Sequence, residues 1–86
     1  MDEAKFEQEL LLNRQAYERL RDHIRRDYDH QYVALAFGKI VGAASTFDEA
    51  SAIVSRLQPQ PEHFLVFEAD QEPMFDEFFD PYSEFL

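Results

Sequence analysis

Residues 31–45, QYVALAFGKIVGAAS, decide the fold of this chain because they form two apolar runs on either side of a turn signal. Both runs are apolar and rich in β-branched and aromatic residues. Gly38-Lys39 separates them. This pattern predicts a β-hairpin. The first run is apolar on both faces, so its strand is predicted to be buried on both faces or to lie in the centre of the sheet. The small residues at positions 42–44 allow another element to pack closely on the second strand.

A long helix is predicted before the hairpin, over residues 2–28, where the sequence has neither Gly nor Pro. Its apolar stripe at helical spacing consists of Phe6, Leu10, Tyr17, Leu20 and Ile24. Asn13 interrupts this stripe. Leu11 and Leu12 are expected to widen the apolar face near the start of the helix.

A second helix and a third strand are predicted after the hairpin. Thr46 and Glu49 form a capping box at the start of a helix over residues 47–57, and the prolines of QPQPEH end it. The run HFLVFEA, residues 63–69, has the composition of a strand. The order α-β-β-α-β predicts an α+β fold with a small three-stranded sheet packed by two helices. The sequence leaves the order of the strands open.

Charge divides the chain into a body, residues 1–69, expected to form a single domain, and an acidic aromatic C-terminal tail, residues 70–86. The net charge is −10 over 86 residues, and residues 68–86 carry seven acids and no base. A surface of this sign repels phosphates and anionic lipid, so we expect no direct nucleic-acid or membrane binding. The chain has no cysteine, no membrane-length apolar run and no apolar signal segment at its acidic N-terminus, which favours a cytoplasmic protein.

The middle of the chain resembles an uncharacterised bacterial family, domain of unknown function 5678, in the stretches QYVALAFGKIVGAA and STFDEASAIV. The matching features are an aromatic-Val-Ala strand start at residues 32–34, a Gly-Lys turn with its following strand at residues 38–41, and the helix cap at Thr46 and Glu49. The resemblance covers about residues 6–67 and leaves the tail outside. It implies the small α-β-β-α-β fold and brings no catalytic residue and no cofactor.

Three residues near the end of the first helix, His23, Asp27 and His30, have a spacing that would let them share one helix face. Imidazole and carboxylate groups bind divalent metals, so a small-ligand or metal-binding accessory domain is one alternative. Arg25 and Arg26 oppose a cation there, and a solvated helix terminus explains the cluster without a metal. No serine lies in a nucleophile motif, and the two glycines form no phosphate-binding loop. We therefore expect no enzyme activity, no cofactor and no metal.

The tail ends in MFDEFFDPYSEFL, residues 74–86, whose aromatic rings fall on one helical stripe with the acids mainly on the other side. Two short helical turns, residues 74–79 and 81–86, are expected to meet at Pro81. The rings either pack on the body of this chain or dock into an apolar, basic-rimmed groove of a partner protein. The expected partner-binding residues are Phe75, Phe78, Phe79, Tyr82, Phe85, Asp76, Glu77 and Asp80.

These features fit a non-catalytic protein-interaction or adaptor module. Its partner would be contacted through the tail, through an apolar helix or sheet face, or through both. The alternative from a different class is an acidic inhibitor that mimics nucleic acid, a hypothesis that depends on net charge alone. An apolar hairpin in so short a chain also makes a homodimer plausible.

Overall fold

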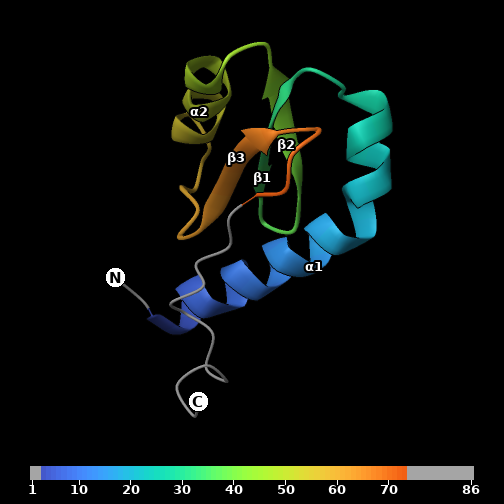
Figure 1. Cartoon of the computed structure of the whole chain (residues 1–86). Helices are drawn as coiled ribbons and strands as arrows, with labels where there is room; N and C mark the ends of the chain where they lie inside the picture. Colours follow the sequence, from blue (N-terminus) through green and yellow to red (C-terminus); the bar gives the residue numbers. More distant parts are fainter. Residues whose placement is uncertain (1–2, 74–86) are drawn as a thin grey trace, which may run out of the picture.

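The structure is a computed structural model that describes residues 3–73. The elements follow one another as α1 (Glu3–Asp27), β1 (Tyr32–Ala36), β2 (Lys39–Ala44), α2 (Phe47–Ser55) and β3 (Phe64–Glu68) (Figure 1). The predicted α-β-β-α-β order and the small α+β fold are confirmed. Among the described residues, neither helix combines the length and the apolar character needed to cross a membrane. The two helical turns expected in residues 74–86 lie outside this range.

The sheet has the strand order β2-β1-β3, and both neighbouring pairs are antiparallel. β1 is therefore the central strand, as its apolar composition predicts. Four of its five residues are buried. In this order β3 is an edge strand, with β1 on one side and no strand of the described residues on the other. The site described below lies along β3.

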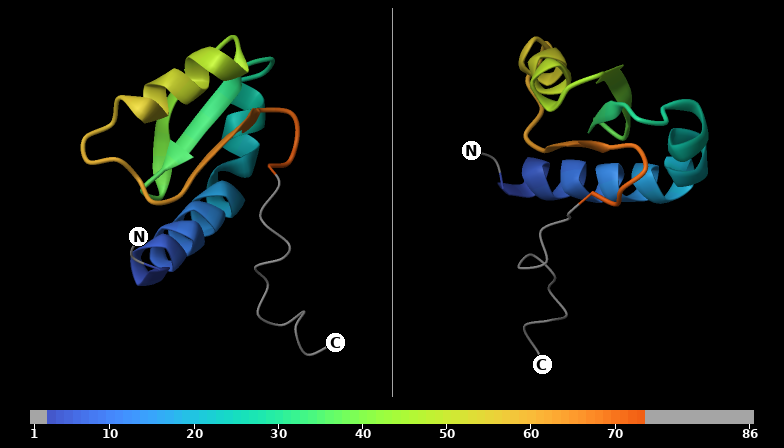
Figure 2. Two further views of the ribbon diagram at one scale, coloured as in Figure 1. Left: turned by 90° about the vertical axis from the view of Figure 1, so that its left-hand side faces the viewer. Right: turned by 45° about the horizontal axis from the view of Figure 1, so that its top comes forward.

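The two helices cover opposite faces of the sheet, as both views in Figure 2 show. Val33 and Leu35 of β1 belong to the core cluster that contains Tyr17 and Ile24 of α1. The alternate residue Ala34 pairs with Gly42 of β2, which lies against α2. Side chains alternate across a strand, so Val33 and Leu35 face α1, whereas Ala34 and Ala36 share the α2 face with Tyr32.

Close packing of α2 on β2 depends on the absence of a side chain at Gly42. A Cβ built at this position would lie 2.8 Å from Cδ1 and 2.9 Å from Cγ2 of Ile53. These separations are shorter than carbon–carbon contact allows. The predicted close approach at the small residues of the second strand is thus confirmed, and its partner is α2.

The hairpin turn is formed by Phe37 and Gly38, whose φ angles are 55° and 73°. The prediction that placed the turn at Gly38-Lys39 is therefore wrong by one residue, because Lys39 is the first residue of β2 and pairs with Ala36. A two-residue loop of type I′, which matches the twist of the strands, has positive φ at both of its positions. The pairing register decides which residues these are.

The buried face of α1 is more polar than the sequence predicts. The five residues of the predicted apolar stripe are all buried or half-buried. Leu11 and Leu12 do not extend this face, since they are 54% and 49% exposed. Glu9 and Asn13 are buried in the helix instead. Figure 1 shows α1 passing below the sheet and then turning up beside it over its last turns.

α2 begins at the predicted cap and ends two residues earlier than predicted. The Thr46 hydroxyl accepts the Glu49 N–H at 3.1 Å, which confirms this half of the capping box. The helix ends at Ser55, and the Gln60 side-chain amide donates to the carbonyls of Ser55 at 2.7 Å and Leu57 at 2.8 Å. This amide therefore satisfies carbonyl groups that the end of a helix leaves without intrahelical partners.

Candidate functional site

A surface hollow of about 400 Å³ lies along β3. It is lined by Tyr32, Leu65, Val66, Phe67, Glu68, Gln71, Glu72 and Pro73. Four of these eight residues belong to β3, and the lining contains two carboxylates and no basic side chain. The hollow therefore joins apolar surface to negative charge beside an edge strand.

The backbone of β3 faces outward at alternate residues. Hydrogen-bonded and non-hydrogen-bonded pairs alternate along an antiparallel ladder. Ala69 N–H donates to Gln31 C=O at 2.9 Å in continuation of the ladder, so Val66 and Glu68 direct their N–H and C=O groups away from β1. The Glu68 carbonyl accepts from Gln71 N–H at 3.0 Å. Both backbone groups of Val66 and the Glu68 N–H therefore remain available at the outer side of β3, and both residues line the hollow.

The opposite edge of the sheet, β2, is irregular. The register shifts between Ala34 and Leu35, which pair with Gly42 and Ile40 and leave Val41 without a partner in the ladder. Bulges and charged side chains make an edge strand a poor template for another strand. By contrast, β3 pairs with β1 in unbroken register along its whole length.

A second hollow, of about 350 Å³, lies against α1. It is lined by Arg14, Tyr17, Glu18, Arg21, Glu72 and Pro73. Glu72 Oε1 lies 3.5 Å from Arg21 Nη1 and 4.0 Å from Arg25 Nη2. Glu72 and Pro73 line both hollows, and residues 74–86 follow directly.

A buried polar network joins α1 to two distant segments. Asn13, with no exposed surface, accepts Gly38 N–H at 2.9 Å and donates to the His63 carbonyl at 3.2 Å and to His63 Nδ1 at 2.9 Å. Glu9 Oε1 accepts Glu62 N–H at 2.8 Å and His63 N–H at 3.3 Å. The network therefore fixes the hairpin turn and the entry to β3 against one helix. None of its residues lines either hollow.

Burial favours the neutral form of the His63 imidazole. Partial burial lowers its pKa below the ordinary value of 6.5, and the negative charge of Glu9 opposes this change. The Phe6 ring meets it edge to face with centroids 5.4 Å apart. Because Asn13 Nδ2 can only donate, His63 Nδ1 must be unprotonated to accept from it.

The cluster suggested by His23, Asp27 and His30 is divided in the structure. Asp27 Oδ2 lies 2.8 Å from His23 Nδ1, and Asp27 Oδ1 lies 3.0 Å from Arg26 Nε. The hydrogen bond from Arg26 lowers the pKa of Asp27, and the same bond raises the pKa of Arg26. His30 pairs with Asp29 instead. The contacts near Asp27 are those of a solvated helix terminus, with both carboxylate oxygens already engaged.

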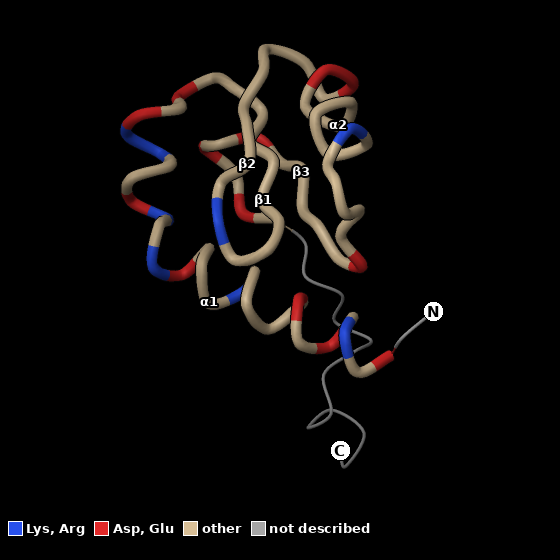
Figure 3. The backbone as a smooth tube through the Cα atoms, turned by 180° about the vertical axis from the view of Figure 1, so that it is seen from behind, with Lys and Arg blue, Asp and Glu red and all other residues tan. Residues whose placement is uncertain are grey.

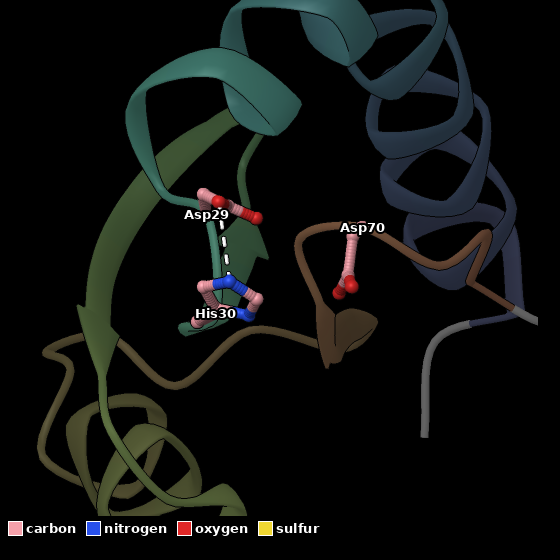
Figure 4. A group of neighbouring side chains, drawn as sticks. All are labelled: Asp29, His30 and Asp70. Atoms are coloured by element: carbon pink, nitrogen blue, oxygen red, sulfur yellow. Dashed lines mark ion pairs between the residues drawn. The ribbon is translucent and has the colours of Figure 1, made fainter.

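His30 lies in a different group of possible metal ligands, with Asp29 and Asp70 (Figure 4). His30 Nε2 is 3.3 Å from Asp29 Oδ2, and one ligand atom of each residue lies within 4.8 Å of the others. The hydrogen bond between Ala69 and Gln31 brings Asp70 to this position. All three side chains are exposed, and exposed acidic groups are common at protein surfaces without a bound ion.

Negative charge at the end of β3 also acts on Tyr32. The charge of Glu68 raises the pKa of the Tyr32 hydroxyl, and burial and the charge of Asp70 add to this change. The Tyr32 ring meets the Phe47 ring edge to face with centroids 6.1 Å apart. The direction of the pKa change indicates a negative electrostatic potential at this end of the β3 hollow.

Basic and acidic residues alternate along α1, as the tube in Figure 3 shows. The electrostatic potential along α1 is therefore mixed rather than of one sign. The negative charge at the end of β3, by contrast, comes from Glu68, Asp70 and Glu72 within five residues that contain no base.

The expected partner-binding residues, which run from Phe75 to Phe85, lie outside the described residues. Two features of the described body escaped the sequence prediction: the buried network around Asn13 and the outward-facing edge of β3. Asn13 gave one signal, since it interrupts an apolar stripe. A polar residue on a buried face needs hydrogen-bond partners, but the sequence does not indicate which they are.

Comparisons with protein-family models, with curated proteins and with solved structures give no match. The resemblance to domain of unknown function 5678 stays a prediction that depends on its short motifs. The functional interpretation therefore depends on the geometry described above and on the sequence of the tail.

Proposed function

We propose that this chain is a non-catalytic protein-interaction module that contacts its partner through the C-terminal tail. The observation that carries this proposal is the position of Glu72 and Pro73. These residues line both surface hollows, and Glu72 lies beside two arginines of α1, so the tail departs from a defined point on the body. A short recognition segment is presented in one direction when its first residues are held by the body.

The chemistry of residues 74–86 defines the partner. Five aromatic residues alternate with four acids, and no base is present. The rings contribute binding free energy when a groove removes them from water, at about 1.5–3 kcal/mol for each large side chain. The acids favour basic residues at the rim of that groove and exclude acidic competitors. The partner is therefore a protein with an apolar, basic-rimmed groove.

The body supplies a scaffold for this segment. Its core is built by residues of α1, β1 and β3, and the Asn13 network fixes α1 against the sheet. The mixed charge along α1 favours the interaction module over a nucleic-acid mimic, because mimicry requires a continuous acidic surface.

Affinity capture with variants of the tail tests the proposal. We compare the whole chain, a form that ends at Pro73, and the double variant Phe78→Ser/Phe79→Ser, with Ser83→Ala as the matched control. Proteins recovered by the whole chain and by Ser83→Ala should be lost from the other two baits. Equal recovery by the whole chain and by the form that ends at Pro73 would rule out the tail as the contact.

A further inference from the structure

We propose that the outer edge of β3 binds an extended basic and apolar segment of a partner protein, which adds to the sheet as a fourth strand. This surface is formed by residues between positions 32 and 73 and does not include residues 74–86. Its test is therefore independent of the proposed role of the tail, and each can fail while the other holds.

The backbone of β3 supplies the main-chain part of this site. The N–H and C=O of Val66 and the N–H of Glu68 point away from β1, and both residues line the hollow along the strand. An extended peptide that pairs with an exposed edge gains its affinity from such main-chain groups. The unbroken register of β3 keeps these groups in line, whereas the bulge in β2 interrupts the opposite edge.

The side chains of the hollow define the sequence of the incoming strand. Leu65 and Phe67 share the α1 face of the sheet, and Val66 and Glu68 share the other face. A strand beside β3 would place its alternate residues next to these two sets. Apolar residues fit the Leu65 side, and basic residues on the other side reach Glu68. The expected partner segment therefore alternates apolar and basic residues.

The charge of the hollow favours a basic partner strand over two other possible occupants, residues 74–86 of the same chain and β3 of a second copy. The eight residues that line the hollow include Glu68 and Glu72 and no base, and the raised pKa of Tyr32 reflects the same negative charge. Residues 74–86 carry four acids and no base, so their charge opposes entry. A second copy of β3 would bring another Glu68 and no basic residue. A basic strand is the complementary occupant.

Nuclear magnetic resonance with a defined peptide tests this inference on the full chain. The probe is the acetylated and amidated peptide KVKVKVK, and the controls are EVEVEVE and a KVKVKVK peptide N-methylated at every residue, which cannot donate a main-chain hydrogen bond in either strand direction. The probe should shift the amide resonances of Val66 and Glu68, and should slow the exchange of the Val66 amide about tenfold at saturation. The N-methylated and acidic peptides should leave these amides unchanged.

Two substitutions separate the backbone from the charge. Val66→Pro removes the outward N–H of Val66 but no hydrogen bond to β1, and should abolish peptide binding. Glu68→Lys should weaken binding about fivefold, whereas Glu7→Lys on the exposed face of α1 should not change it. If Val66→Pro fails to fold, Glu68→Lys still tests the inference. Its spectrum without peptide shows whether this variant keeps the fold.

Three outcomes would overturn the inference. Peptide-induced shifts confined to α1 or to β2 would place the site elsewhere. Protection of the Val66 amide in the free protein that increases with protein concentration would identify a second copy as the occupant. Protection of the Val66 amide in the free protein that does not depend on protein concentration would show that another part of the same chain covers the outer edge of β3.

Discussion

One buried amide, that of Asn13, joins three segments that are distant in the sequence. Its partners Gly38 and His63 lie 25 and 50 positions away. Each hydrogen bond is worth only about 1 kcal/mol net, but a buried group left without its partner loses more. Truncation of Asn13 would leave the Gly38 N–H without its acceptor and His63 without its donor.

Asn13→Ala should lower the free energy of unfolding by about 2–4 kcal/mol, because it removes three buried hydrogen bonds and leaves a cavity. Urea denaturation followed by circular dichroism measures the change. Gln15→Ala, at an exposed position of the same helix, is the matched control and should change stability by less than about 0.5 kcal/mol. Equal effects of the two substitutions would show that the network does not hold the elements together.

Stability should decrease on acidification through the titration of His63. Its pKa is lowered in the folded protein, so between the folded value and 6.5 the unfolded chain binds more protons. The contribution of His63 to the free energy of unfolding is therefore complete above pH 6.5. It is lost as the pH falls from 6.5 toward the folded pKa, and does not change further below it. Glu9 is the charged group that faces the ring and limits this effect.

Urea denaturation of the whole chain and of His63→Gln, repeated between pH 8 and pH 5, isolates this term. The substitution removes the titrating group, so the difference in free energy of unfolding between the two proteins should shrink as the pH falls below 6.5. A difference that stays constant over this range would show that His63 does not contribute to the pH dependence.

At the scale of elements, the contact between β2 and α2 depends on the missing side chain at Gly42. Gly42→Ala should lower the free energy of unfolding by about 1–3 kcal/mol, because the new methyl group overlaps the Ile53 side chain. The overlap can be relieved from the other side of the contact. Ile53→Ala removes both atoms that the new Cβ would meet, although it leaves its own cavity.

A double-mutant cycle over Gly42→Ala and Ile53→Ala checks this prediction. The double variant should be more stable than the sum of the two single changes predicts, because each substitution offsets part of the other. Thermal and urea denaturation of the four proteins give the coupling. Additive effects would mean that α2 moves away from the sheet rather than meeting the new methyl group.

The elements could be predicted from the sequence because their signals are local. Thr46 and Glu49 indicate the start of α2 from a spacing of three residues, and apolar composition identifies β1 as central. The position of the hairpin turn could not be read in the same way. The left-handed conformation of Phe37 follows from the pairing of Ala36 with Lys39, and the register of two strands is not a local property.

The candidate site was less accessible to sequence reasoning for the same reason. Val66 carries outward backbone groups only because β1 lies between β2 and β3, and the sequence left this strand order open. The polar group of Asn13 could be noticed, but its partners in the hairpin turn and before β3 depend on the tertiary fold. The acidic aromatic character of the tail was evident from composition alone.

At the scale of the whole molecule, the proposed function assigns core formation and recognition to different parts of the chain. The buried apolar cluster runs from Ala16 to Ala69 within the described residues. Glu72 forms partly exposed ion pairs with Arg21 and Arg25 of α1. Exposed pairs of this kind are worth about 0–1 kcal/mol. The proposed function therefore requires that the body stay folded when residues 74–86 are removed.

Deletion of residues 74–86 should change the melting temperature by less than about 4 °C, since a domain of this size loses about 4–8 °C for each kcal/mol. A chain that ends at residue 69 should melt slightly lower still, because it also loses the contacts of Glu72 with α1. Calorimetry of the whole chain and both truncations measures these differences at one protein concentration. A fall of more than about 8 °C for the first truncation would show that the aromatic rings stabilise the body, and that docking to a partner would have to overcome this packing.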